Sequence, residues 1–230
     1  MLEFLSSHEL GILRWLHIIA MVYWLGGEWG VFQTSYKVVN PALSYDERMR
    51  HMDTAYKIDI LARTGIISLL PLGMHMGYLH GVQPWGGTFL VVMWIAYAAW
   101  LAVTYGAFFK RGTALGAKLR MIEDWSRYIL IPTLIISGLS SLTGHGPFAA
   151  GEGEKWFAAK ILTFGSLLII GVILRLIMHQ WDTQFKILAV GPDEKAEKTL
   201  EKSIAVGHRV AYIYWIGIMA TAFFGAVKPF

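Results

Sequence analysis

The stretch GILRWLHIIAMVYWLGGEWGVFQ, residues 11–33, is apolar over a length that can cross a lipid bilayer as one helix. The hydrocarbon core of a bilayer requires about 20 helical residues. The stretch nevertheless carries Arg14, His17 and Glu28. Ionisable side chains are costly in lipid unless they have a partner, and those that occur there are usually functional. Residues 11–33 therefore predict both a membrane-spanning helix and a functional site.

Five further segments resemble this one in length and composition. The chain is 55% hydrophobic and 16% charged, with a mean hydropathy of +0.48, which is typical of membrane proteins rather than soluble domains. Pro71 and Pro132 interrupt two of the segments, and membrane helices tolerate such prolines. We expect residues 1–230 to form one all-α integral membrane domain, a polytopic bundle of about six transmembrane helices. The predicted spans are 11–33, 60–82, 87–109, 127–146, 156–180 and 205–226.

Basic residues are concentrated in alternate connections between these spans. The connection GVQPWGG has no basic residue and GPFAAGEGEK has only Lys155. The first, third and fifth connections hold Lys37, Arg48, Arg50, Lys57, Lys110, Arg111, Lys118, Arg120, Lys186, Lys195, Lys198 and Lys202. Because cytoplasmic loops are enriched in Lys and Arg, these connections are predicted to be cytoplasmic and both termini to lie outside. We expect a multi-pass protein of a bacterial inner membrane with periplasmic termini. The N-terminal segment lacks a basic n-region and a small-residue cleavage site, so no removable signal peptide is expected.

Two helix starts are predicted in the cytoplasmic connections. Ser44 and Glu47 have the spacing of a capping box, which predicts a helix that runs into the second span. Asp193 is expected to begin a second charged helix, EKAEKTLEKS. These helices either extend the bundle or lie against anionic lipid or a partner, and the sequence leaves both readings open.

The absence of cysteine restricts the cofactor chemistry. It excludes disulfides, thiolate iron–sulfur or zinc sites and the C-x-x-C-H attachment of c-type haem. The chain has eight histidines, several of them inside predicted spans. Histidine is a common axial ligand of haem that is held without covalent bonds, so haem b is the favoured cofactor. The basic residues behind the pI near 9.2 lie in the loops, so no nucleic-acid partner is expected.

His17 and His75 are predicted at a similar depth, near the outer side, on neighbouring antiparallel spans. Two imidazoles at one level can hold a haem iron, so this pair is the preferred ligand set and metal site, with His145 as an alternative ligand. His80 lies about 140° around the helix from His75, so both cannot readily face one iron. A hydrogen bond to a neighbouring carbonyl is the plainer explanation for any single one of them.

A second haem is left open at the inner side. His179 and His208 are predicted near the inner ends of the fifth and sixth spans, where they could complete an electron path across the bilayer. An imidazole at the membrane interface costs little free energy, however, so histidines also occur there without binding a ligand.

Charged residues provide partners for these cofactors. Lys160 and Arg14 are predicted near the depth of His17, where each could pair with a haem propionate. Lys160 could also bind a substrate carboxylate, transfer a proton, or only extend toward the interface. Glu28 and Arg63 are predicted at one inner depth, which favours an ion pair that is either structural or part of a proton route to a quinone. Lys160, Arg63 and Glu28 are therefore the candidate catalytic residues.

The tripeptide Met74-His75-Met76 offers an alternative chemistry. Thioether and imidazole ligands suit Cu(I), which would make the chain a copper-binding protein. On a regular helix, however, the two methionines point to other faces than His75, so the three side chains cannot converge.

Several of these segments resemble one family. RWLHIIAMVYWLGG resembles the opening helix of the CopD-like and HemJ-like membrane proteins, and KWFAAKILTFGSLLIIGVI resembles a later helix of that group. The resemblance implies b-haem ligation by His17 and a role in activity for Arg63 and Lys160. Members of the group include copper-uptake proteins, a protoporphyrinogen oxidase and cytochrome-like proteins fused or partnered to cytochrome c. Six spans and a late lysine set this chain apart from the oxidase branch.

The sequence thus favours a b-type cytochrome of the membrane. The expected function is electron transfer between a quinol pool and a haem or protein acceptor at the outer face. Expected partners are membrane lipid, a quinone and a separate cytochrome c or redox subunit, and a homo-oligomer is left open. Whether the chain is an enzyme alone or the membrane subunit of an oxidoreductase also stays open. The alternatives are copper transport, porphyrinogen oxidation and a cofactor-free membrane anchor.

Overall fold

The computed structural model describes residues 7–148, 151 and 153–230. Two parts of the chain lie outside the described residues. The first is residues 1–6, at the start of the N-terminal segment for which no signal peptide is expected, and the second is Ala149, Ala150 and Glu152 of the fourth connection. The described chain is all-α, as predicted. Its helices are α2 (Glu9–Val38), α3 (Tyr45–Leu79), α4 (Thr88–Phe109), α5 (Ala114–Leu142), α6 (Trp156–Leu188) and α7 (Glu194–Val227).

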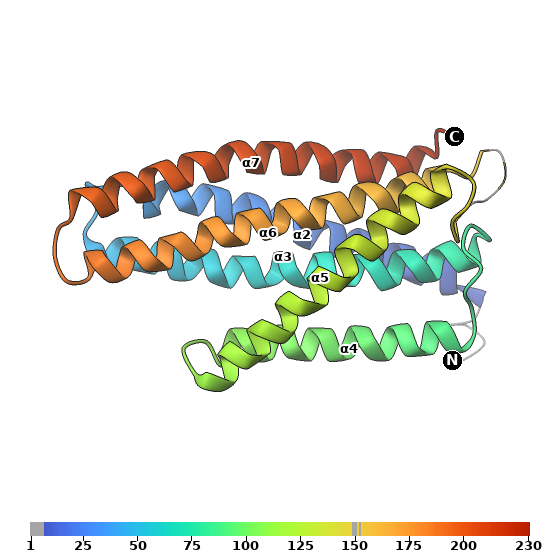
Figure 1. The fold of residues 1–230 in the computed structure, drawn as a ribbon, viewed down its shortest axis with the longest axis horizontal. Coiled ribbons are helices and arrows are strands. Elements are labelled where there is room, and N and C mark those ends of the chain that lie inside the picture. The colour runs from blue at the N-terminus through green and yellow to red at the C-terminus, as the bar shows by residue number, and fades with distance from the viewer. Residues whose placement is uncertain (1–6, 149–150, 152) are drawn as a thin grey trace.

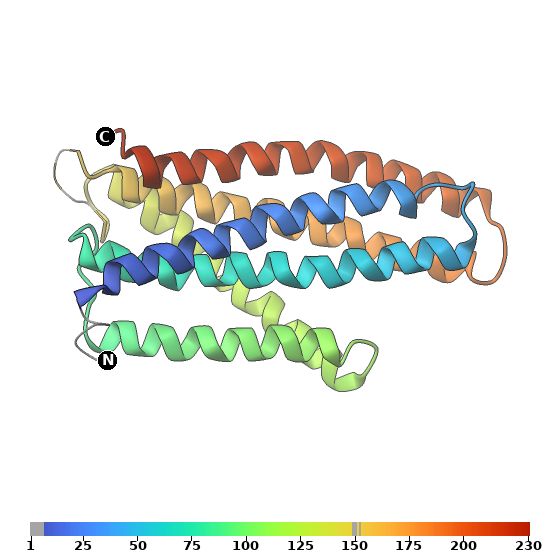
Figure 2. The same cartoon turned by 180° about the vertical axis from the view of Figure 1, so that it is seen from behind.

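The helices form an elongated bundle with the start of α2 and the end of α7 at the same end (Figure 1). We call this the termini end, and the opposite end, with connections 39–44 and 189–193, the far end. The connection 110–113 lies in the same half of the bundle but stops short of that end (Figure 1). Helix α2 packs along α3, and α6 packs along α7. Helix α5 lies against α6 near the termini end and crosses obliquely to reach α4, which stands at the edge of the bundle (Figures 1 and 2).

Five of the six helices are long and apolar enough to span a membrane, namely α2, α3, α4, α6 and α7. Helix α5 does not meet this criterion because its first half carries Arg120, Glu123, Asp124 and Arg127. The predicted fourth span, 127–146, also extends beyond the end of α5 at Leu142. Several long apolar helices suggest a multi-pass membrane protein.

The predicted helix starts at the far end are confirmed. Ser44 accepts a hydrogen bond from the backbone N–H of Glu47, and the Glu47 carboxylate accepts one from the N–H of Ser44, which completes a capping box. Asp193 caps α7 by accepting from the N–H of Ala196. Both helices continue without a break into the apolar segments. At 33 to 35 residues, α3, α6 and α7 are about 50 Å long, which exceeds a hydrocarbon core of about 30 Å.

The extra length is stabilised by a small core of its own at the far end. Trp181, Phe185 and Leu200 are buried there between α6 and α7. Arg48 of α3 is 4% exposed and forms a two-pronged ion pair with Glu197 of α7, at 2.6 and 2.8 Å. Of the two readings that the sequence left open, the structure has helices that extend the bundle.

Close packing of α2 on α3 fixes how α3 is rotated about its axis. A Cβ atom added to Gly65 would lie 2.4 Å from the carbonyl oxygen of Ala20 and 2.6 Å from the N atom of Trp24. A Cβ on Gly27 would lie 2.8 Å from the Cβ of Ala62. Small residues at such contacts let two membrane helices approach closely. The residues of α3 on this face therefore point toward α2.

Gly65→Ala is expected to destabilise the bundle by about 1–3 kcal/mol, because the new methyl group meets backbone atoms that cannot move aside. The matched control is Gly26→Ala, whose Cβ would have no atom within 4 Å. The control should be neutral or slightly stabilising, by about 0.5–1 kcal/mol. Unfolding in mixed detergent micelles, followed by circular dichroism, measures both. Equal stability of the two variants would contradict the close approach.

Candidate functional site

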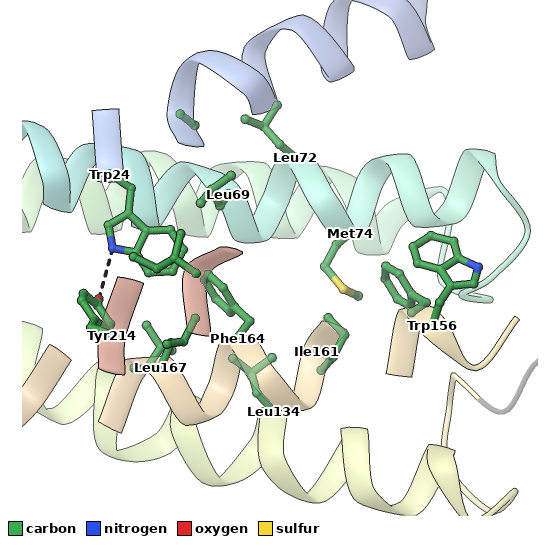
Figure 3. Close-up of a cluster of buried hydrophobic side chains, with 14 of the residues drawn as sticks. Trp24, Leu69, Leu72, Met74, Leu134, Trp156, Ile161, Phe164, Leu167 and Tyr214 are labelled. Atoms are coloured by element: carbon green, nitrogen blue, oxygen red, sulfur yellow. Dashed lines mark hydrogen bonds between the residues drawn. The ribbon is translucent and has the colours of Figure 1, made fainter. Parts of the chain in front are cut away.

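A cavity of about 580 Å³ lies toward the termini end between α2, α3, α6 and α7. Cavities of about 300–1,000 Å³ commonly hold small molecules and cofactors. The walls are apolar and include Trp24, Leu69, Phe157, Phe164 and Ile218. Figure 3 shows Trp24, Leu69, Met74, Ile161 and Phe164 together in this part of the core. The cavity therefore suits a ligand with a large apolar body.

The titratable side chains around this cavity are cationic or basic. Arg14, Lys160, Lys228, His17 and His80 line it, and no carboxylate does so among the described residues. Lys228 also lies over the ring of Trp156, with its Nζ atom 4.9 Å from the ring centroid. Lys160 has no ion-pair partner in the described part of the chain. Unpaired cations beside an apolar cavity favour a ligand that carries negative groups.

His17 extends from α2 into the wall of this cavity. It lies over Gly73 of α3, where an added Cβ would be 3.5 Å from the Cε1 atom of the imidazole. Its Nδ1 atom is buried without a hydrogen-bond partner, and no described residue bonds to Nε2. Buried polar atoms normally have partners, so an unsatisfied one points to a missing ligand or water. The plainer explanation for this histidine, a bond to a neighbouring carbonyl, does not apply in this structure.

Lys160 reaches the cavity past the last turn of α7. A Cβ on Gly225 would lie 2.5 Å from the Nζ atom of Lys160, so the glycine leaves the space that the ammonium group occupies. Lys160, Arg14 and His17, which the sequence predicts at similar depth, all line this one cavity.

His75 faces away from this cavity. Its Nδ1 atom accepts a hydrogen bond of 3.3 Å from Trp94 of α4, and its Nε2 atom lies 3.2 Å from a carboxylate oxygen of Glu9. It lines a shallow depression on α4 instead. The structure thus does not bring His17 and His75 together, because both nitrogens of His75 are engaged on another face of α3.

His80 is the imidazole that the sequence did not select. It follows the last residue of α3 and lines the cavity together with His17. The signal lies in its spacing: His80 is seven residues after Gly73, which returns to within about 20° of the same helix face. Since Gly73 packs on His17, that face is the one turned toward the cavity.

The other three predicted haem ligands lie elsewhere. His145 is exposed in the segment after α5 and does not line the cavity. His208 is bonded through Nε2 to Ser35 at 2.6 Å and packs on the ring of Phe32. His179 is exposed and lines a cleft of α3, α4, α5 and α6. His179 and His208 therefore face different neighbours, and the structure does not bring them together for a second haem.

The predicted direct ion pair between Glu28 and Arg63 is not formed. Arg63 pairs with Asp59, one turn earlier on α3, and lies 3.8 Å from Glu123 of α5. Glu28 has no ion-pair partner among the described residues, although it lines a small internal cavity together with Arg63. Asp59 is the nearer carboxylate because residues four apart on a helix face each other.

The sequence also missed a charged network around Glu123. The Glu123 carboxylate accepts hydrogen bonds from Arg127 at 2.5 Å and from Arg175 of α6 at 3.1 Å. Asp124 lies 3.4 Å from Arg127 and 3.3 Å from Arg175. The side chain of Glu123 is fully buried by these contacts. Because the sequence predicted the fourth span as 127–146, Glu123 and Asp124 were placed outside the membrane helices. Their ion pairs with Arg127 and Arg175 were therefore not predicted.

The described residues do not form a site for a bare metal ion. Among the described residues, no group of three or more His, Asp or Glu side chains is placed to hold one. Met74 and Met76 line the large cavity while His75 faces α4, so the three do not converge. A cofactor that needs only one or two imidazoles from the protein is not restricted in this way.

The fold and the cavity define an all-α protein with the helices of a multi-pass membrane protein and a cationic site between four of them. Comparisons with known protein families, with curated proteins and with solved structures give no match. The resemblance to the CopD-like and HemJ-like proteins stays a prediction.

Proposed function

We propose that the chain is a b-type cytochrome that binds haem b in the cavity between α2, α3, α6 and α7. The observation that carries the proposal is the imidazole of His17, unpartnered at the wall of an apolar cavity of about 580 Å³ that is bordered by cations. Haem has the matching chemistry: an iron that binds imidazole, an apolar macrocycle and two anionic propionates.

Each part of the cavity has a role in this proposal. His17 and His80 would hold the haem iron through their imidazole nitrogens. Arg14, Lys160 and Lys228 bind the propionates through charge-assisted contacts. Trp24, Phe157 and Phe164 exclude water from the macrocycle, which tunes its potential. When bound, the haem supplies one-electron transfer.

The position of the cavity suggests the direction of electron transfer. It lies toward the termini end, which the distribution of basic residues predicts to be the outer side. We propose that a membrane quinol donates electrons and that a separate cytochrome c or redox subunit accepts them at this face, in a bacterial inner membrane. The chain then acts as the electron-transfer subunit of an oxidoreductase.

The proposal predicts a haem spectrum that depends on His17. Protein purified from haem-replete cells should give a reduced-minus-oxidised spectrum of b type, with haem quantified as the pyridine haemochrome. His17→Ala should lose this signal because the macrocycle loses an axial ligand inside the cavity. The matched control is His145→Ala, which removes an exposed imidazole outside the cavity and should retain the haem. Size-exclusion chromatography checks that both variants keep the fold. A colourless wild type, or full haem in His17→Ala, would refute the proposal.

Porphyrinogen oxidation is the second candidate. The same apolar cavity, with the unpaired Lys160 at its border, also matches the carboxylates of a tetrapyrrole substrate. Aerobic assay of the purified protein with protoporphyrinogen separates the two functions. Turnover that Lys160→Met abolishes, while the haem spectrum is unchanged, favours the oxidase; a haem protein without turnover favours the cytochrome.

A further inference from the structure

A second, smaller cavity lies nearer the far end and has charged side chains among mostly apolar walls. It has a volume of about 70 Å³, and its lining includes Glu28, Asp59, Arg63, Trp100 and Tyr214. Glu28 is eleven residues beyond His17, which places it about 16 Å further along α2. This inner cavity is thus separate from the cationic cavity at the termini end.

The inner cavity adjoins a cleft of about 210 Å³. Asp59, Arg63, Arg127 and Arg175 line both the inner cavity and the cleft. The cleft is bordered by α3, α4, α5 and α6 and includes Arg111, in the connection between α4 and α5. Figure 1 shows α5 crossing obliquely away from α6 toward α4 in this half of the bundle. The two spaces therefore adjoin, with these four charged side chains at their boundary, on the side of Glu28 that faces the far end.

An unsatisfied donor indicates that the inner cavity contains water. The Nε1 atom of Trp100 is buried without a hydrogen-bond partner and lines the cavity, whereas the Nη1 atom of Arg175 lies 3.3 Å from Asp124 without a well-aligned hydrogen bond. A buried water molecule needs polar partners and about 10–15 Å³ of accessible volume, so a volume of about 70 Å³ admits several. Charged groups at membrane depth typically border such water-filled cavities.

The inner cavity is closed toward the cationic cavity by a layer of aromatic side chains. Trp24 lines the cationic cavity, Tyr214 lines the inner one, and Phe164 lines both. The Nε1 atom of Trp24 donates a hydrogen bond of 3.1 Å to the Tyr214 hydroxyl, and the Trp24 and Phe164 rings meet edge to face at 5.9 Å. Figure 3 shows this hydrogen bond with Phe164 beside it. The layer lies between the two cavities.

We propose that the cleft and the inner cavity form an aqueous half-channel that carries protons from the far end to Glu28. A proton arriving through water binds the Glu28 carboxylate, which has no ion-pair partner to hold it ionised. The Arg63–Asp59 pair and the arginines around Glu123 keep the path polar while their charges stay balanced. This proposal does not depend on what the cationic cavity binds.

Single-cysteine variants test the half-channel directly, because the chain has no cysteine of its own. Leu174→Cys places a thiol in the inner cavity, and Ile173→Cys places one at the same depth on the exposed side of α6. On α5, Leu130→Cys and Ile129→Cys form a second matched pair. The probe is an anionic, membrane-impermeant methanethiosulfonate, which reacts with thiolates and therefore needs water at the thiol.

The probe should label Leu174→Cys and Leu130→Cys and leave Ile173→Cys and Ile129→Cys unlabelled. Labelling is expected from the far face alone, in inside-out vesicles if that face is cytoplasmic, because the aromatic layer blocks the other route. Labelling of neither cavity cysteine, or of both members of a pair equally, would overturn the half-channel. Labelling from the termini face would overturn its closure at Trp24 and Tyr214.

Infrared spectroscopy tests the end of the path. Acidification should produce a protonated-carboxyl band that is missing in Glu28→Gln and that shifts promptly in D₂O. A band that is unaffected by Glu28→Gln, or that exchanges only on unfolding, would overturn the assignment of Glu28 as the proton acceptor.

Discussion

Glu123→Gln is expected to lower the free energy of unfolding by about 3 kcal/mol, the lower part of the range for breaking a buried ion pair. The change leaves Arg127 and Arg175 facing a neutral amide, at positions now 2.5 and 3.1 Å from the carboxylate, with Arg63 at 3.8 Å. The glutamine keeps the shape of the side chain, so the cost is electrostatic. It stays in the lower part of the range because the adjoining cleft can hydrate the arginines.

An exposed pair provides the control for Glu123. Glu194 and Lys198 form an ion pair at the start of α7 with side chains 81% and 65% exposed. Glu194→Gln should change the stability by no more than about 0.5 kcal/mol, as for other solvent-exposed helix pairs. Chemical unfolding in mixed micelles compares the two variants. If Glu123→Gln unfolds at the wild-type denaturant concentration, the network does not hold α5 on α6.

A double variant separates repulsion among the arginines from loss of the ion pair. Arg175→Gln added to Glu123→Gln removes one of the cations that the first change leaves unpaired. The double variant should therefore be more stable than Glu123→Gln alone, because uncompensated buried charge is costlier than a neutral pair. A further loss of stability in the double variant would show that Arg175 acts through other contacts.

Local signals in the sequence were sufficient for most of the fold. Apolar length predicted α2, α3, α4, α6 and α7, and the capping box at Ser44 with the cap at Asp193 predicted where the long helices begin. Helix α5 was harder to predict as a membrane-spanning helix, because its charged first half and its apolar second half together give an intermediate hydropathy. Its charges are partners for Arg175 of α6, and such pairing is not visible in the sequence of α5 alone.

The level of the site along the bundle was predictable from the sequence, whereas helix rotation was not. Counting residues from the membrane surface placed His17, Arg14 and Lys160 at one level, and the structure brings them to one cavity. Depth alone does not distinguish the faces of α3. Rotation is set by the contact of Gly65 with α2, which turns Gly73 toward His17. His75 is two residues later, about 200° around the helix, and so faces α4.

His80→Ala is therefore expected to alter the haem site, whereas His75→Ala is not. In the cytochrome that we propose, His80 shares the cavity with His17, while His75 is engaged with Trp94 and Glu9. Loss of the His80 nitrogen should convert the haem from low-spin to high-spin and weaken its binding by at least about tenfold, since loss of even a hydrogen-bonding partner of a metal ligand commonly costs about tenfold to a hundredfold. Absorption spectra and haem titration of the two variants measure both effects.

The same comparison decides between the two histidines of α3. His75→Ala is matched to His80→Ala because each removes one imidazole from the last turns of one helix, on opposite faces. A low-spin spectrum that persists in His80→Ala and is lost in His75→Ala would mean that α3 is rotated in the haem-bound protein. A low-spin spectrum lost only in Met76→Leu would assign the second ligand to a thioether that also lines the cavity, and would raise the expected reduction potential. Loss of the low-spin spectrum in His80→Ala is the one result that agrees with a rotation of α3 fixed by the contacts of Gly65 and Gly73.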